Sequence, residues 1–315
     1  MIRSVTDAAD FTLDPDAPYT ADAAALFEDG ETEPSLCFVL EEDGRRLGRI
    51  GFRTAPTTSR PEWLGTLPPT ELFTFGLDLP LDDPVLAGGF VEDALGRLPD
   101  SLPDLVEARF NAEIHDAPEA TVQLLNGIGF ELFQEKQGYW WEHDGSVIGR
   151  PARLEWVTLA ETGPERYGGV MSPCIAGTLD RNDRYYWEGC GPENWAAQML
   201  ELSDDPEMWL LGLEAGQPVG YVAVNAIEDW GATISHIGVL PERRGNGHVH
   251  RLLQAAMALC LERDITTMLS DVDVLNTPMR QAFLRAGYRQ DARPWHVWVM
   301  RRRRRGEERR MANSE

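Results

Sequence analysis

The stretch ISHIGVLPERRGNGHVHRLLQAAM, residues 234–257, joins an apolar strand to an amphipathic helix through the turn PERRGNGH. The start of a helix exposes backbone amides that lack intrahelical partners, and the helix dipole adds partial positive charge there. Glycines allow a ligand to approach the backbone, and arginines donate charge-assisted hydrogen bonds. The turn therefore predicts an anion site at the start of the helix, of the kind that binds phosphate.

The chain repeats one pattern of elements. EIHDAPEATVQLLNGIGF in the first half and DVLNTPMRQAFLRAGY in the second each read as strand, proline-containing turn, amphipathic helix and Gly-aromatic pair. Upstream of them, β-rich hairpins match around Gly48 and Gly220. We therefore expect two homologous domains, residues 1–148 and 149–300, followed by an arginine-rich tail, residues 301–315, that is disordered or lies on the acidic body.

Hydrophobic periodicity predicts an α/β (α+β) class, with each domain a mixed, mostly antiparallel sheet flanked by helices. The first domain is shorter at its start, so its opening helices are expected to be reduced. In the second domain, the segment DRNDRYYWEGCGPENW, residues 180–195, is expected to be a loop that leads into a helix at about residues 193–202. Strands are expected near residues 154–158, 209–214, 219–226, 233–239, 267–274 and 295–300.

Composition limits the classes of function. The 315 residues carry a net charge of −23, and the tail contributes +4, which leaves −27 on residues 1–300. Such a body disfavours nucleic acid and anionic membranes as partners, despite the arginine-rich tail, and favours a cationic or neutral small molecule. The sequence has no apolar run long enough for a membrane span, no signal peptide and no metal-ligand spacing. We expect a cytoplasmic protein without a metal, and the sequence leaves a homodimer open.

The second half resembles the GCN5-related N-acetyltransferases, the GNAT family. That family's acetyl-CoA loop, [Q/R]-x-x-G-x-[G/A], falls on Arg244-Gly245-Asn246-Gly247-His248-Val249. Arg244 and Gly247 match, whereas Val249 stands where the family has Gly or Ala. The segment from Asn276 to the pair Gly287-Tyr288 also resembles the family. The resemblance covers residues 154–300, and it extends to the first half with fewer matches.

The resemblance implies acetyl-CoA as co-substrate. Backbone amides of the loop would hold the pyrophosphate, and the edge of the preceding strand would pair with the pantetheine arm. The implied contact residues are Ile237, Gly238, Val239, Arg243, Arg244, Gly245, Asn246, Gly247, His248, Val249, Asn276 and Phe283.

Three positions bear on catalysis. The family often has a tyrosine, placed to protonate the departing thiolate, where this chain has Phe283, so another group or water must supply that proton. Direct transfer also requires a base for the amine, and our candidates are His236 before the loop and Asp273, which shares a strand face with Asp271. The alternative for His236 is a structural role, as a packed and hydrogen-bonded histidine of the strand. The alternative for Asp271 and Asp273 is a solvated or salt-bridged position at the end of their strand.

In the first half, the segment that aligns with the loop reads LPLDDPVLAGG, with Asp82 and Asp83 in place of two arginines. Carboxylates there would repel a pyrophosphate, and Pro84 lacks an amide donor. We expect this degenerate domain to bind no coenzyme A.

The resemblance favours an N-acetyltransferase that acts by direct transfer on a small cationic amine. Residues 180–188 offer aromatic faces and carboxylates for such an acceptor. The same residues would also suit a surface loop whose aromatic side chains pack against the domain. The alternative is a non-catalytic acyl-CoA-binding sensor or assembly module, for which Phe283 and Val249 argue.

Overall fold

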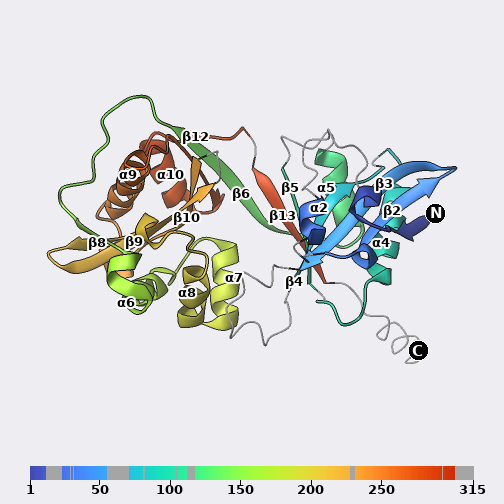
Figure 1. Ribbon diagram of the computed structural model, residues 1–315, viewed down its shortest axis with the longest axis horizontal. Coiled ribbons are helices and arrows are strands. Elements are labelled where there is room, and N and C mark those ends of the chain that lie inside the picture. Colours follow the sequence, from blue (N-terminus) through green and yellow to red (C-terminus); the bar gives the residue numbers. More distant parts are fainter. Residues whose placement is uncertain are drawn as a thin grey trace. The chain divides into compact units, whose positions relative to one another are not determined.

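The computed structural model describes residues 1–11, 23–28, 30, 32–54, 71–80, 82–103, 105–111, 118–227, 231–292 and 294–301. The chain forms two compact units, Met1–Phe133 together with the residues from His296 onward, and Gln134–Trp295. We call them unit 1 and unit 2. Figure 1 labels their elements.

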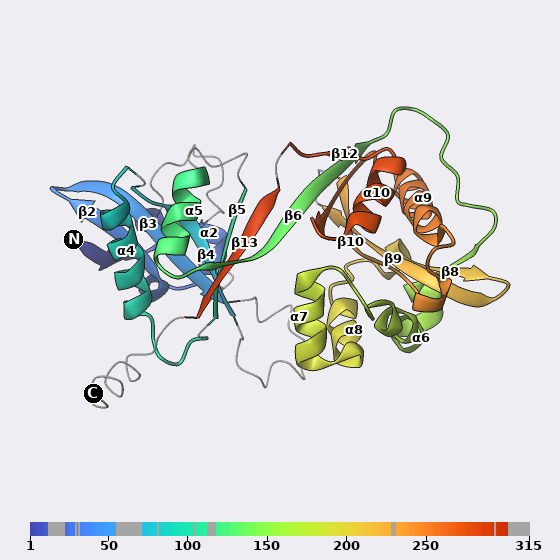
Figure 2. The ribbon, with the colours of Figure 1, turned by 180° about the vertical axis from the view of Figure 1, so that it is seen from behind.

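Unit 1 is a sheet with the strand order β1-β2-β3-β4-β5-β13, in which β4 and β5 run parallel and β1 to β4 antiparallel. Helices α4 and α5 lie side by side, as Figure 2 shows. The core contains Phe38, Phe52, Phe90 and Trp298. The elements are β1 (Ile2–Ser4), α1 (Ala8–Phe11), α2 (Ala23–Glu28), η1 (Pro34–Leu36), β2 (Cys37–Glu42), β3 (Arg45–Thr54), β4 (Glu71–Asp78), α4 (Pro84–Arg97), β5 (Leu105–Asn111), α5 (Pro118–Gly127) and β13 (Trp295–Arg301).

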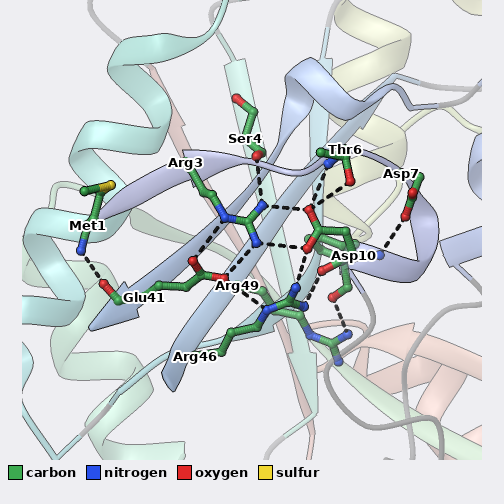
Figure 3. A network of polar contacts seen from close by, with 10 residues as sticks. Met1, Arg3, Ser4, Thr6, Asp7, Asp10, Glu41, Arg46 and Arg49 are labelled. Carbon is green, nitrogen blue, oxygen red and sulfur yellow. Dashed lines mark hydrogen bonds and ion pairs between the residues drawn. The ribbon is translucent and has the colours of Figure 1, made fainter. Parts of the chain in front are cut away.

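The N-terminal strand of unit 1 is held by an ion network (Figure 3). The Arg3 guanidinium donates to both carboxylate oxygens of Asp10, at 2.7 and 2.9 Å, and to both oxygens of Glu41. Arg46 pairs with the same two carboxylates. The hydrogen bonds from Arg3 hold the pKa of Asp10 well below its usual range. The network ties α1 to the β2–β3 hairpin.

The strands of unit 2 follow the order β6-β11-β10-β9-β8-β7, with β12 beside β6. Helices α9 and α10 cover one face and α6, α7 and α8 the other (Figures 1 and 2). The elements are β6 (Glu131–Glu142), β7 (Glu155–Thr158), α6 (Leu159–Cys174), α7 (Arg181–Cys190), α8 (Pro192–Leu200), η3 (Pro206–Met208), β8 (Trp209–Glu214), β9 (Gln217–Ile227), β10 (Gly231–Val239), η4 (Pro241–Arg243), α9 (His248–Leu261), β11 (Thr267–Asp273), α10 (Thr277–Arg285) and β12 (Arg289–Gln290).

The two β-hairpins of the proposed repeat use the same turn. Asp43-Gly44 joins β2 to β3 with φ of 50° and 77°, and Ala215-Gly216 joins β8 to β9 with φ of 50° and 74°. Two successive positive φ angles define the type I′ turn, which matches the twist of the flanking strands. The expected α/β class, with two mostly antiparallel sheets and their helices, is confirmed.

The compact units divide the chain differently from the halves of the repeat. Strand β6 comes from the first half, yet from Gln134 onward it belongs to unit 2, where it pairs with β11. Strand β13 comes from the second half, yet from His296 onward it belongs to unit 1. The boundaries 1–148 and 149–300 therefore describe the repeat and stay a prediction, and residues 302–315 of the tail lie outside the described residues.

The expectation of a loop at residues 180–195 is wrong, because the structure has helix α7 at Arg181–Cys190 and begins α8 at Pro192. The Asp180 carboxylate caps this helix by accepting hydrogen bonds from the amides of Asn182 and Asp183, at 2.9 and 3.1 Å. Tyr186 and Trp187 then pack against the core of unit 2. The cluster of Asp, Arg and Asn that resembled a turn is a helix start.

Candidate functional site

Strands β10 and β11 separate at the centre of unit 2. They pair in parallel at Ala232 with Met268 and at Thr233 with Leu269, where the paired register ends. On the other side, β9 accompanies β10 to Val239, past a bulge at residue 235. The segment Ile237–Val239 therefore keeps one edge free of β11. We call this opening the strand gap.

Close packing fixes the backbone beside the strand gap. A Cβ on Gly238 would lie 2.7 Å from Cε1 of Tyr221 and 2.8 Å from Cβ of Cys174. A Cβ on Gly220 would lie 2.2 Å from the carbonyl oxygen of Gly238. Only glycine fits at either position, and the Tyr221 ring consequently lies directly against β10.

The loop after β10 leaves the start of α9 open. Gly245 and Gly247 have φ of 78° and 73°, in the left-handed region that favours glycine. Gly247 is the N-cap of α9, and as a glycine it makes no side-chain cap hydrogen bond. The first-turn amides are therefore available to an anion, as the sequence predicts.

The side chains of Arg244 and Asn246 brace the loop. Arg244 donates from Nε to the carbonyl oxygen of Val239 at 3.1 Å and from Nη2 to that of Cys174 at 2.8 Å. The Asn246 amide donates to the carbonyl oxygens of Arg243 and Arg244, each at 3.2 Å. Arg244, although exposed, thus holds the loop in position, and the half-buried Arg243 lies 3.6 Å from Glu214.

His248 and Val249 begin α9 and pack inward. His248 is buried, and this burial lowers the pKa of its imidazole, whose Nδ1 faces Nη1 of Arg251 at 3.1 Å. Val249 packs against the core of unit 2. Contact of an anion with these two residues would therefore use their backbone amides.

His236 lies on β10 next to the strand gap and contacts three elements. Its Nε2 is 2.9 Å from Asp183 Oδ2 on α7, and its Nδ1 is 2.5 Å from the Tyr221 hydroxyl on β9. The Trp195 ring of α8 meets the imidazole edge-on, with centroids 4.9 Å apart. The His236 side chain is 16% exposed and that of Asp183 is 21% exposed, so both remain accessible from one side.

This arrangement satisfies His236 in both of its protonation states. A carboxylate only accepts hydrogen bonds, so Nε2 carries a proton toward Asp183. In the neutral ring, Nδ1 accepts from the Tyr221 hydroxyl; in the imidazolium, Nδ1 donates to the same oxygen. Burial raises the pKa of Tyr221 well above its usual value, so the phenol stays neutral and can play either part. His236 can therefore take up and release a proton without movement of a heavy atom.

Asp273, the second catalytic candidate, is fully buried at the end of β11. Its Oδ1 accepts from the amide of Leu275 at 2.8 Å, and its Oδ2 accepts from the amide of Arg181 at 3.2 Å and from Gln134 Nε2 at 3.1 Å. Asp271, by contrast, is more exposed and pairs with Lys136. The structure thus separates the two strand aspartates and puts Asp273 in a network that holds the start of α7.

Asn276 and Phe283 belong to α10. The Asn276 side chain caps the helix by accepting from the amide of Met279 at 3.3 Å. Phe283 is buried and stacks on Tyr139 with ring centroids 5.1 Å apart. Phe283 is therefore a core residue, and we leave it out of the proposed cofactor contacts.

The comparisons with known proteins agree with this geometry. Residues 176–288 match the family model described as Acetyltransferase (GNAT) family. These residues belong to the GNAT family. They contain α7, the strand gap, the loop and α10, and we call unit 2 the GNAT unit. The chain therefore contains an acetyltransferase domain. The GNAT family uses acetyl-CoA as its co-substrate. A comparison with curated proteins gave no match.

Solved structures share the fold over both units. A GCN5-related N-acetyltransferase from Sphaerobacter thermophilus aligns with a TM-score of 0.60 at 16% identity, over 95% of each chain. A tandem GNAT protein from the clavulanic acid biosynthesis pathway aligns with a TM-score of 0.53 at 15% identity, over 84% of this chain and 82% of that one. An acetyltransferase of the GNAT family from Colwellia psychrerythraea aligns with a TM-score of 0.51 at 11% identity, over 96% and 100%.

A groove of about 580 Å³ follows the loop of the GNAT unit along α9. It is lined by Val147, Ile148, His250, Gln254, Met257, Arg285 and Ala286. Its lining combines apolar side chains with the polar side chains of His250, Gln254 and Arg285.

The counterpart in unit 1 is closed by its own side chain. Asp83 is the N-cap of α4, and its carboxylate accepts from the amide of Leu86 at 3.0 Å. Pro84 follows as the first helical residue and has no amide proton. These two residues support the prediction that unit 1 binds no coenzyme A.

Other features bear on the remaining expectations. Among the described residues, no helix is long and apolar enough to cross a membrane. Over the same residues, no group of three or more His, Cys, Asp or Glu side chains is placed to hold a metal ion. Sequence reasoning named residues 180–188 as acceptor-lining but missed Tyr221, whose pairing with Gly238 on β10 only the strand register reveals.

Proposed function

We propose that the GNAT unit transfers an acetyl group from acetyl-CoA to a small cationic amine by direct attack. The loop amides of residues 245–249 would bind the pyrophosphate, and the free edge of Ile237–Val239 would pair with the pantetheine arm. These contacts would bring the thioester to the strand gap, next to His236. The observation that carries the proposal is the position of His236 between Asp183 and Tyr221, beside the free strand edge.

In the proposed reaction, the amine nitrogen bonds to the acetyl carbon and the C–S bond breaks. A protonated amine first releases one proton to solvent so that its nitrogen has a lone pair, and the attacking nitrogen loses a second proton as the amide forms. Nδ1 of His236 holds a lone pair for that second proton. Since the Tyr221 hydroxyl occupies that direction and the Tyr221 side chain is buried, the proton would reach Nδ1 through this hydroxyl and a bridging water: Tyr221 gives its proton to Nδ1 and takes one from the water, which takes one from the amine. The departing thiolate takes its proton from water, because Phe283 has no hydroxyl.

The choice of a cationic acceptor rests on charge. Asp183 and Glu188 lie on α7, the exposed Tyr185 ring offers an aromatic face, and residues 1–300 carry −27. Carboxylates and aromatic faces both attract an ammonium group. We extend the proposal to a cytoplasmic enzyme, and we leave the homodimer open.

The test combines binding and turnover. Calorimetry with acetyl-CoA should give one site per chain, and thiol release should be measured over polyamines, amino sugars and amino acid amides, with matching alcohols as controls. His236→Ala should lower kcat by about 10²-fold or more, because general base catalysis contributes that much. His143→Ala, which changes a histidine outside the site, is the matched control.

The non-catalytic sensor stays the second candidate because Phe283 removes the family's usual acid. Tight acetyl-CoA binding without turnover on any amine would favour the sensor. Turnover that His236→Ala abolishes would exclude it.

A further inference from the structure

Helix α7 of the GNAT unit is attached to both strands that border the strand gap. Asp183, in its first turn, contacts His236 on β10 at 2.9 Å. The amide of Arg181, at its first residue, donates to Asp273 on β11 at 3.2 Å. The two strands have already separated at these positions. The start of α7 therefore bridges the gap on the face covered by α6, α7 and α8.

The start of α7 is fixed by a buried network. The two amide protons of Gln134 Nε2 serve Asp180 Oδ1 at 3.0 Å and Asp273 Oδ2 at 3.1 Å. Asp180 in turn caps α7 through the amides of Asn182 and Asp183. Gln134 and Asp273 are nearly or fully buried. Since these bonds define where the first turn lies, they define the position of the Asp183 carboxylate.

The contact of Asp183 has a chemical consequence for His236. A free imidazole exchanges its proton between two nitrogens, and the partner of one nitrogen decides which of them is basic. The carboxylate of Asp183 keeps the proton on Nε2 and turns the lone pair at Nδ1 toward Tyr221. The opposite tautomer would set a lone pair against the carboxylate.

We propose that Asp183 is a positioning residue, held by the Gln134–Asp180–Asp273 network, that fixes the tautomer and orientation of His236 for proton transfer. The inference rests on the proposed function, since it assigns Asp183 a part in the same reaction. It also gives Asp273 a role, as the anchor of α7 rather than as a base.

The experiment has a spectroscopic arm that requires no turnover. In protein labelled with ¹⁵N-histidine, ring-nitrogen spectra report which nitrogen carries the proton, and His236→Gln assigns the signals. The wild type should show an Nε2–H resonance in the downfield range of an imidazole bonded to a carboxylate. Asp183→Ala should lose that resonance, and Asp183→Asn, which keeps an oxygen but no charge, should move it upfield. An Nδ1–H tautomer in the wild type, or an unchanged resonance in Asp183→Ala, would overturn the proposal.

The kinetic arm separates positioning from general damage. Asp183→Ala should lower kcat about 10- to 100-fold, with the KM for acetyl-CoA within twofold of wild type, because the loop is untouched. Glu165→Ala removes an exposed carboxylate from α6, outside residues 180–188 and the loop, and should leave kcat within twofold. If the wild type acetylates an amine and Asp183→Ala has the same kcat, the role assigned to Asp183 is wrong, whereas the proposed function still holds. If wild type acetylates no amine, the proposed function fails, and the ring spectra still decide the role of Asp183.

Discussion

Asp83 and Gly247 both stand at the N-cap of a helix in their own unit, but only Asp83 fills the helix start with its side chain. The Asp83 carboxylate already accepts from an amide of α4. Gly247 contributes no side chain, and its φ of 73° turns the chain into α9. One helix start is thus satisfied internally, and the other is open to an external anion.

Gly247→Ala should weaken coenzyme A binding. A Cβ at φ of 73° costs about 1–2 kcal/mol in the left-handed region, and relief of that strain would displace the amides of the first turn. We expect the Kd for coenzyme A to rise about tenfold by calorimetry.

Gly216→Ala is the matched control for that variant. Its φ is 74°, and it lies in the β8–β9 turn away from the loop. Gly216→Ala should lower the free energy of unfolding, measured in urea, by about as much as Gly247→Ala does. Its Kd for coenzyme A should equal that of the wild type. Equal Kd values in the two variants would argue against the loop as the anion site.

Arg244→Ala should act mainly on stability. Its guanidinium donates hydrogen bonds to the carbonyl oxygens of Val239 and Cys174. Loss of these two hydrogen bonds should lower the free energy of unfolding by about 1–3 kcal/mol. Arg243→Ala removes the neighbouring arginine, whose one ion pair in the described structure is with Glu214 at 3.6 Å, and should cost less than about 1 kcal/mol, because ion pairs that solvent reaches contribute little. If Arg244 were a direct phosphate ligand instead, its variant would lose affinity with little change in unfolding.

The features of the site that the sequence could predict are those made by residues close together in the chain. The loop from Arg243 to Val249 is local, and its glycines, arginines and helix start are contiguous, so the sequence alone could predict the glycine turn into α9. That an anion binds there stays a prediction. The buried position of Phe283 was not, because stacking on Tyr139 depends on β6 lying in the same sheet as β11.

The environment of His236 was the hardest part to foresee. Its partners, Asp183 and Tyr221, are 53 and 15 residues away in the sequence. Helix α7 was misjudged because its cap, Asp180, also suits a turn. The same separation hid the role of Asp273, whose partner Gln134 is 139 residues away.

Tyr221→Phe should impair turnover more than binding. It removes the hydroxyl that faces Nδ1 of His236 and leaves the ring against Gly238 in place. We expect kcat to fall about 10- to 100-fold with an unchanged KM for acetyl-CoA, measured by thiol release. Tyr167→Phe, which removes a buried hydroxyl bonded to the carbonyl oxygens of Leu210 and Val222, is the control for loss of a phenol. A kcat equal to that of the wild type in Tyr221→Phe would show that the proton does not pass through the Tyr221 hydroxyl.

Buried thiols should make the protein lose stability in alkali. Burial raises the pKa of Cys174 and of Cys260 to about 12 from the ordinary 9.0. Between these values the folded state keeps protons that the unfolded chain releases, so the contribution to stability is full below pH 9 and is lost as the pH rises toward 12. The slope is at most about 1.4 kcal/mol per pH unit for each thiol. Cys260→Ala should flatten the decline in urea-unfolding free energy between pH 8 and 10.5, whereas Cys190→Ala, at a thiol that is only partly buried, should change it less. A decline that is equally steep in Cys260→Ala and wild type would assign the alkaline loss to other groups.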